Sequence, residues 1–326
     1  MRRRMPGKKL LKMLLPIIGL LLVATTVTLC WLVYKITRPP RQAYLVTPET
    51  FTLLSERGLK ATNEEWANRD GTRARGWLLR GSPGAPAVVL LHRYGADRSW
   101  LLNLGVKLNE ATNFTILWPD LRGHGMDPPV AWSSFGGREA DDLGAAIEYL
   151  KGIKVQDRQL VGNAIGLYGV ELGGYAALRE GARNQSVRAM VLDSLPSMPN
   201  DILNSAVKQR GGLSNSFLKW LARGGTRIYF LGKYDNTPSC DAARQLGDRH
   251  VLLLAGDGPP ELRASTQALV QCFPAGTEVI SDLPLTGYNL PLAPGKQGEE
   301  YDRRVIEFFD KELSSPAFLP TLNSGP

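Results

Sequence analysis

Cysteine is scarce in this chain of 326 residues, which contains only three. Cys30 lies in an apolar segment, so Cys240 and Cys272 are the two that remain for the rest of the protein. Neither has the spacing of a metal-binding motif, and the sequence predicts no metal site and no cofactor. The two could pair outside the cytoplasm, but their spacing does not distinguish a disulfide from two buried free thiols.

Acidic residues are missing from the first 41 positions, which hold nine of the 39 basic residues of the chain. The remaining 30 basic residues face 31 acidic ones, so the rest of the chain is close to neutral. The sequence pI of about 9.4 therefore reflects the N-terminus and not a basic surface for nucleic acid. We predict no nucleic-acid partner.

Charge of either sign is absent between Met13 and Tyr34, a run of 22 residues. At ~1.5 Å per residue such a helix spans a hydrocarbon core of ~30 Å, and Trp31 and Tyr34 suit the membrane interface at its end. The six basic residues before the run predict a cytoplasmic N-terminus over residues 1–12 and an extracytoplasmic domain, periplasmic or extracellular. The lipid bilayer is thus the expected partner of residues 13–34. The alternative is a cleaved signal peptide, although its apolar region is usually shorter.

Strand and helix patterns alternate after a basic linker at residues 35–44. Apolar runs such as "PAVVLLH" and "VRAMVLD" are typical of strands buried on both faces, and "GREADDLGAAIEYLKGI" is typical of a helix. Alternation of this kind predicts an α/β fold with a mostly parallel sheet flanked by helices. Such folds place their sites at the carboxyl ends of the strands. His92, Asp120, Glu171, Asp193 and Asp257 end or closely follow predicted strands, so we expect them on one rim.

Four segments in order carry a family resemblance: "VVLLHRYGADRS", "WPDLRGHGMD", "FGGREADDLGAAIEYL" and "IGLYGVELGGYAAL". They resemble the oxyanion loop, the D-x-R-G-H-G motif, the helix after it and the nucleophile elbow of the alpha/beta-hydrolase superfamily. More narrowly, the chain resembles its membrane-anchored esterase- or peptidase-like members. The resemblance implies an eight-stranded sheet over residues 45–313 and a lid-type insertion near 196–235. The tail at 314–326 is rich in Pro and Ser, so we expect it to be frayed.

The resemblance also assigns positions to the catalytic parts, and several are occupied by unusual residues. Glu171 stands where the family has its serine nucleophile, and Tyr288 stands where it has histidine. No histidine follows His250. Asp257 is displaced by two residues from the usual acid position, with Asp193 as a possible substitute. The family's oxyanion loop and pocket correspond to His92, Arg93, Tyr94 and Leu172.

These departures favour a degenerate hydrolase that has kept the fold and serves as a binding or scaffold protein. One alternative is a hydrolase in which Glu171 is a carboxylate nucleophile, and another is a hydrolase built on a different constellation with His92 or Tyr288. We hypothesise that Arg93 and Glu171 form an ion pair across the former active site. The expected ligand is small and apolar or ester-like, and the sequence names no protein partner.

The predicted lid region is rich in aromatic side chains within "NSFLKWLARGGTRIYFLGKY". Ordinary packing of a lid on the core explains them, as does an apolar ligand pocket. A third interpretation is a surface that rests on the bilayer near the anchor.

Overall fold

The computed structural model describes residues 7–54, 58, 60–211, 215–232, 234–290 and 295–314. The chain divides into two compact units, which we call the N-terminal unit (Met1–Thr37 with Leu203–Tyr234) and the sheet unit (Arg38–Ile202 with Asp235–Pro326). The predicted tail at 314–326 lies outside the described residues from residue 315 onward, as do residues 1–6 of the basic N-terminus.

The sheet unit is built on eight strands in the order β1-β2-β4-β3-β7-β8-β9-β10. Strands β1, β2 and β4 pair antiparallel, and all other neighbours are parallel, so the predicted mostly parallel eight-stranded sheet is confirmed. Asp70-Gly71 lies in the turn between β1 and β2, where Gly71 has a φ of 80°. The strands are β1 (Thr62–Ala67), β2 (Arg73–Leu79), β3 (Ala85–Leu91), β4 (Thr115–Pro119), β7 (Val161–Val170), β8 (Val187–Asp193), β9 (His250–Leu254) and β10 (Glu278–Ile280).

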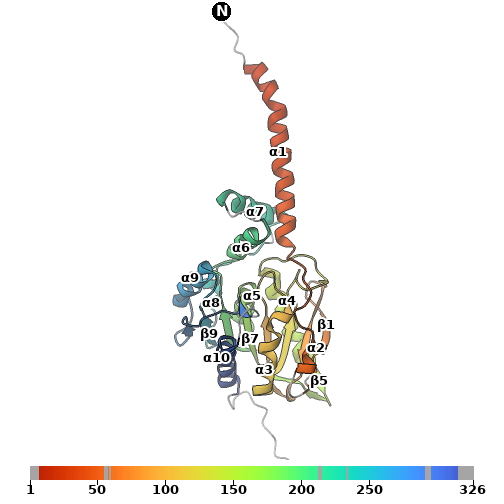
Figure 1. The fold of residues 1–326 in the computed structure, drawn as a ribbon, viewed down its shortest axis with the longest axis vertical. Coiled ribbons are helices and arrows are strands. Elements are labelled where there is room, and N and C mark those ends of the chain that lie inside the picture. The colour runs from red at the N-terminus through yellow and green to blue at the C-terminus, as the bar shows by residue number, and fades with distance from the viewer. Residues whose placement is uncertain are drawn as a thin grey trace, which may run out of the picture. The chain divides into compact units, whose positions relative to one another are not determined.

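Helices cover both faces of this sheet (Figure 1). Side chains of α3 and α10 join Val88 and Leu90 of β3 in one buried apolar cluster, so these two helices share a face. Helices α4 and α5 pack against each other on the remaining side, where Gly144 meets Glu180. The helices of the unit are α2 (Pro48–Leu54), η1 (Arg98–Leu101), α3 (Leu102–Thr112), α4 (Gly137–Gly152), α5 (Leu172–Arg183), α8 (Ser239–Ala243), α9 (Pro260–Leu269), η2 (Val270–Cys272) and α10 (Lys296–Leu313).

A small hairpin of β5 (Lys154–Val155) and β6 (Arg158–Gln159) was not predicted. Its two turn residues, Gln156 and Asp157, have φ values of 49° and 63°. Two-residue hairpin turns with both central residues at positive φ match the twist of the strands they join, but they usually contain glycine or asparagine. The sequence therefore offered a weak signal for this turn.

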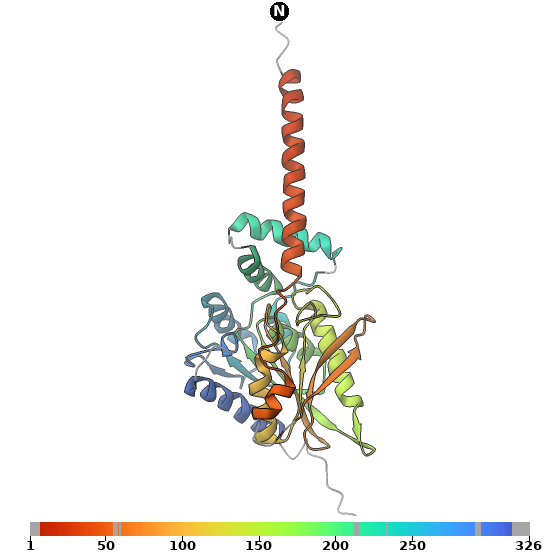
Figure 2. The same ribbon diagram turned by 45° about the vertical axis from the view of Figure 1, so that its right-hand side comes forward.

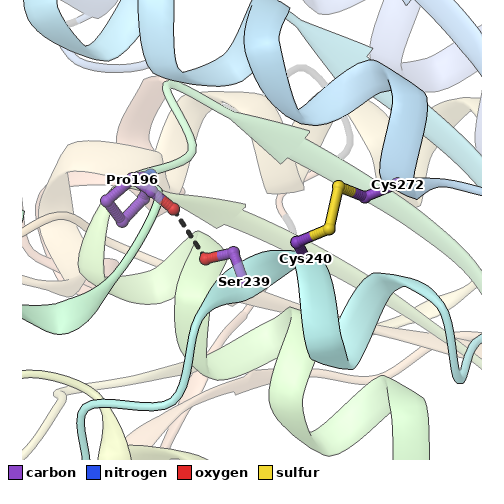
Figure 3. The surroundings of a disulfide bond; sticks show 4 residues. All are labelled: Pro196, Ser239, Cys240 and Cys272. Carbon is purple, nitrogen blue, oxygen red and sulfur yellow. Dashed lines mark hydrogen bonds between the residues drawn. A yellow bond between two sulfur atoms is a disulfide. The ribbon is translucent and has the colours of Figure 1, made fainter.

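Cys240 of α8 and Cys272 of η2 form a disulfide, which answers the question that their spacing left open (Figure 3). Ser239 beside it donates a hydrogen bond of 2.6 Å to the carbonyl oxygen of Pro196. The disulfide closes a segment that contains β9 and α9. Cys30 is free and exposed on α1.

The N-terminal unit consists of α1 (Gly7–Thr37), most of α6 (Pro199–Gly211) and α7 (Ser216–Tyr229). By length and composition, residues Lys12–Thr37 of α1 are sufficient to cross a membrane. Helix α7 lies beside the C-terminal part of α1 in both views (Figures 1 and 2). The two helices approach closely, because a Cβ atom on Gly225 would overlap side-chain atoms of Leu29 and Val33.

Candidate active site

The elbow between β7 and α5 keeps a sharp turn although its central residue is glutamate. Glu171 has φ 48° and ψ −104°, and its side chain is completely buried. A non-glycine residue at positive φ costs about 1–3 kcal/mol, which neighbouring structure must offset. The Glu171 N–H donates to the carbonyl oxygen of Asp193 at 3.0 Å, and Gly173 allows the turn to pack on β3, because a Cβ there would overlap the backbone of Leu91 and His92.

The carboxylate of Glu171 lies against the loop that follows β3. The backbone N–H of Tyr94 donates a hydrogen bond of 3.1 Å to Oε2 of Glu171. Glu171 also precedes Leu172, the buried first residue of α5, where the partial positive charge of a helix N-terminus favours an anion. In enzymes with this kind of elbow, a donor from this loop stabilises the negative oxygen that develops on the substrate. Here the protein's own carboxylate accepts from it.

Arg93 does not form the ion pair with Glu171 that the sequence suggested, so that hypothesis is wrong for the residues described. Its Nε donates to the carbonyl oxygen of Tyr288 at 3.2 Å, and its Nη1 donates to the carbonyl oxygen of Tyr94 at 2.9 Å. The guanidinium lies between two rings, 4.3 Å from the Tyr288 centroid and 4.4 Å from that of Trp100. Cation–π contact and carbonyl acceptors thus hold Arg93 without a carboxylate.

Asp193, at the end of β8, is the buried acid that the structure connects to the loop carrying Tyr288. Its Oδ2 accepts from the backbone N–H of Gly287 at 2.7 Å and from the hydroxyl of Tyr301, and its Oδ1 accepts from Ser194 Oγ at 2.8 Å. Tyr168 shares a hydrogen bond of 2.7 Å with the Tyr301 hydroxyl. Burial raises the pKa of Asp193 to about 6, while these donors act in the opposite direction.

Asp257, predicted at the acid position, lies elsewhere in the structure. Its side chain is 69% exposed and forms an ion pair of 2.8 Å with Arg263. Asp120 is buried but contacts a different set of groups, namely the Tyr44 hydroxyl at 2.8 Å and the Arg98 backbone N–H at 3.2 Å. The five strand-end residues thus have different partners, and after Asp257 the chain turns through Gly258-Pro259 into α9.

None of the three histidines of the chain is placed to act as a general base for Glu171. His92 is buried, with Nε2 accepting from the Leu121 N–H at 3.1 Å and Nδ1 donating to the Arg93 carbonyl at 2.8 Å. Burial lowers the pKa of His92 to about 4 and that of His124 to about 3, so both rings are neutral at pH 7. His250 begins β9, at the opposite end of the strands, and contacts Glu312 at 2.9 Å.

Sequence reasoning did not identify Trp100, Tyr168 and Tyr301 as parts of this region. Tyr301 lies on α10 and Tyr168 lies within β7, among largely apolar neighbours. A signal was present, because a buried tyrosine usually finds a partner for its hydroxyl. Across the residues that the structure describes, no group of three or more His, Cys, Asp or Glu side chains is arranged to hold a metal ion.

The strand order, the elbow and the loop after β3 define the class of protein: the chain has the alpha/beta-hydrolase fold. An esterase from Pyrococcus furiosus superposes with a TM-score of 0.63 at 17% identity, over 85% of this chain and 98% of its own. A Penicillium alpha/beta hydrolase gives a TM-score of 0.57 at 16% identity, covering 78% of this chain and 100% of its own. An esterase from Exiguobacterium antarcticum gives 0.55 at 17% identity, covering 76% and 99%.

Neither a protein-family model nor a curated protein sequence matches the chain. These three solved structures share fewer than one residue in five with the chain, so the similarity shows the fold alone.

Proposed function

We propose that this protein is a membrane-anchored alpha/beta-hydrolase-fold protein that binds a ligand or partner and does not turn over substrate. The observation that carries the proposal is the hydrogen bond from the Tyr94 N–H to the buried Glu171 carboxylate. A substrate carbonyl needs that donor as negative charge develops on its oxygen. With the donor engaged by Glu171 Oε2, a substrate oxygen at the same place would have to compete with this buried side chain for the Tyr94 N–H.

The other parts of the former centre are engaged in the same internal manner. Asp193 receives hydrogen bonds from Gly287 and Tyr301 in place of an imidazole, and Arg93 joins Tyr288 to the backbone of Tyr94. A nucleophile needs a base to activate it or to activate the water that releases it. The positions of the three histidines argue against such a base. The expected ligand is a small apolar or ester-like molecule, since pockets of this fold lie beside the elbow.

The close fit of α1 and α7 supports a retained anchor over a cleaved signal peptide. Gly225 has no side chain and leaves room for Leu29 and Val33. Small residues at a contact between two membrane helices let the helices approach closely. A signal peptide has no reason to match a segment of the mature chain. We therefore infer that α1 remains attached and crosses the bilayer, with residues 1–12 in the cytoplasm.

A second candidate function is hydrolysis with Glu171 as a carboxylate nucleophile, as the sequence left open. The observation that favours it is the retained elbow backbone of Glu171, with φ 48° and ψ −104°. Attack by this residue at an alkyl carbon of the substrate forms an ester on the Glu171 carboxyl and releases the leaving group, whereas attack at an acyl carbon forms a mixed anhydride; in either case water must then cleave the intermediate.

Activity measurements on the full-length protein in detergent separate the two candidates. We expect no labelling by a fluorophosphonate probe and no turnover across a panel of short- and long-chain esters. Glu171→Gln keeps the side-chain length and removes the carboxyl group, so it is the matched control. Turnover by the wild type that Glu171→Gln abolishes would overturn the binding proposal.

Glu171→Ser tests whether the elbow alone is the missing part. We expect no appreciable esterase activity from this variant, because general-base assistance contributes typically 10²–10⁴-fold and no histidine is placed to provide it. Activity well above that of the wild type would reveal a base that the proposal does not include.

A further inference from the structure

Helix α7 presents a row of large apolar side chains to its surroundings. Phe217, Trp220 and Ile228 are 61%, 67% and 70% exposed, and Leu231 just beyond the helix is 85% exposed. Steps of three or four residues separate these positions, with exposed Gly224 between them, so they lie along one side of the helix. Contiguous apolar surface of this kind on a protein indicates a contact with a membrane or another molecule.

The adjacent side of α7 is fixed to the end of α1. Leu221, Ala222, Gly225 and Thr226 are buried or nearly so, and Gly225 meets Leu29 and Val33. Leu29 lies 16 residues and Val33 lies 20 residues after Met13, the first residue of the uncharged run. At ~1.5 Å per residue these are ~24 and ~30 Å along α1, against a hydrocarbon core of ~30 Å. Helix α7 is therefore attached to α1 at the depth where the hydrocarbon ends.

The charge of this segment suits an anionic membrane surface. Between Asp201 and Asp235 the sequence contains no acidic residue and six basic ones, which are Lys208, Arg210, Lys219, Arg223, Arg227 and Lys233. Three of these, Lys219, Arg223 and Arg227, follow one another at steps of four residues on α7, so they form a row beside the apolar side chains. Helices that lie in a membrane interface combine an apolar side with Lys and Arg at its border.

We propose that α7 is a second membrane contact, which lies in the interface of an anionic phospholipid bilayer with Phe217, Trp220 and Ile228 directed into the acyl boundary. This inference rests on the proposed function in one respect, since it requires α1 to span the same bilayer. The predicted lid region then does not open freely into water. It is held at the membrane surface by its own apolar side chains.

Site-directed spin labelling of the full chain in vesicles of phosphatidylcholine and phosphatidylglycerol tests the proposal. Replacing Cys30 with serine leaves only the disulfide-bonded Cys240 and Cys272, so one added cysteine takes the label. Labels at Trp220→Cys and Ile228→Cys are compared with Leu20→Cys in the middle of α1 and Glu307→Cys on α10 of the sheet unit. Collision with lipid-soluble oxygen and with a water-soluble nickel complex reports the depth of each label.

We expect the labels at positions 220 and 228 to favour oxygen over nickel, as the label at position 20 does, while the label at position 307 favours nickel. Nickel accessibility at 220 and 228 equal to that at 307 overturns the proposal and leaves the anchor intact, provided position 20 is in lipid. Protection from both reagents together with spin–spin broadening overturns it in favour of a second copy packed on α7. A label at position 20 that nickel reaches refutes the anchor itself, and with it both proposals.

Discussion

At the residue scale, Glu171 shows how one side chain can change which group binds the hydrogen-bond donors beside a strand-to-helix turn. Serine at an elbow leaves the donors of the neighbouring loop available to a substrate. Glutamate is two atoms longer in reach, and its Oε2 contacts the Tyr94 N–H at 3.1 Å. The sequence showed that Glu171 stands where the family has serine, but it did not identify the hydrogen-bond partner of Glu171. The choice between Arg93 and a backbone N–H depends on where the loop after β3 lies.

Asp193 gives a pH-dependent prediction at the same scale. Burial raises its pKa from 3.8 to about 6. Because the folded-state pKa is raised, the contribution of this group to stability is complete below about pH 4 and is lost as pH rises through about 6. We expect the free energy of unfolding of the wild type, relative to Asp193→Asn, to fall by up to about 3 kcal/mol across this range.

Denaturant unfolding of the full-length protein and of Asp193→Asn in the same detergent, at pH values between 4 and 7, measures this difference. Asp142, whose pKa is also raised to about 6, is common to both proteins and cancels in the comparison. Parallel stability curves for the two proteins would show that Asp193 titrates in the folded state as it does in the unfolded chain.

At the scale of elements, the packing of α7 on α1 predicts opposite effects for two neighbouring glycines. A Cβ on Gly225 would overlap Leu29 and Val33, whereas a Cβ on Gly224 has no atom within 4 Å. Leucine favours a helix over glycine by about 0.5–1 kcal/mol at either position. We expect Gly225→Leu to lose that gain and to destabilise the contact of the helices by a further ~1–3 kcal/mol from overpacking.

The rate of tryptic cleavage after Arg223 and Arg227 in detergent reports this local loosening. Gly225→Leu should be cleaved faster than the wild type, and Gly224→Leu at the same rate or more slowly. Equal rates for the two variants would mean that α7 does not rest on α1 through Gly225.

Most elements of the sheet unit were predictable because their patterns are strong. Continuous apolar runs gave β3 and β8, and the acidic first turn and basic last turn gave α4, in which Glu139 accepts hydrogen bonds from Ser134 and Gly136. The β5–β6 hairpin was missed because its turn residues are not the usual ones. Helix α2 was missed because its seven residues carry little periodicity.

At the scale of the whole molecule, the disulfide and the basic N-terminus lead to one prediction about sidedness. Disulfides persist outside the reducing cytoplasm, and basic flanks remain inside it. We expect Cys240 and Cys272 of the full chain, expressed in cells and then denatured, to resist a polymer-linked maleimide until a reductant is added. The double variant Cys240→Ser with Cys272→Ser is the control. Immediate reaction of both cysteines would place the sheet unit in the cytoplasm.

The sequence by itself determined the class of the fold, the apolar run of α1 and the identity of the residues at the elbow. These follow from local patterns: the period of apolar residues, the absence of charge, and short motifs whose order along the chain is fixed. The tertiary structure decided which groups meet, because those contacts join segments far apart in the chain. In the folded chain, Glu171 contacts Tyr94, Arg93 contacts Tyr288 and Trp100, and Asp193 contacts Gly287 and Tyr301. The tertiary structure also placed α7 on α1, since only the packing of Gly225 shows which side of an amphipathic helix is covered and which side is left exposed.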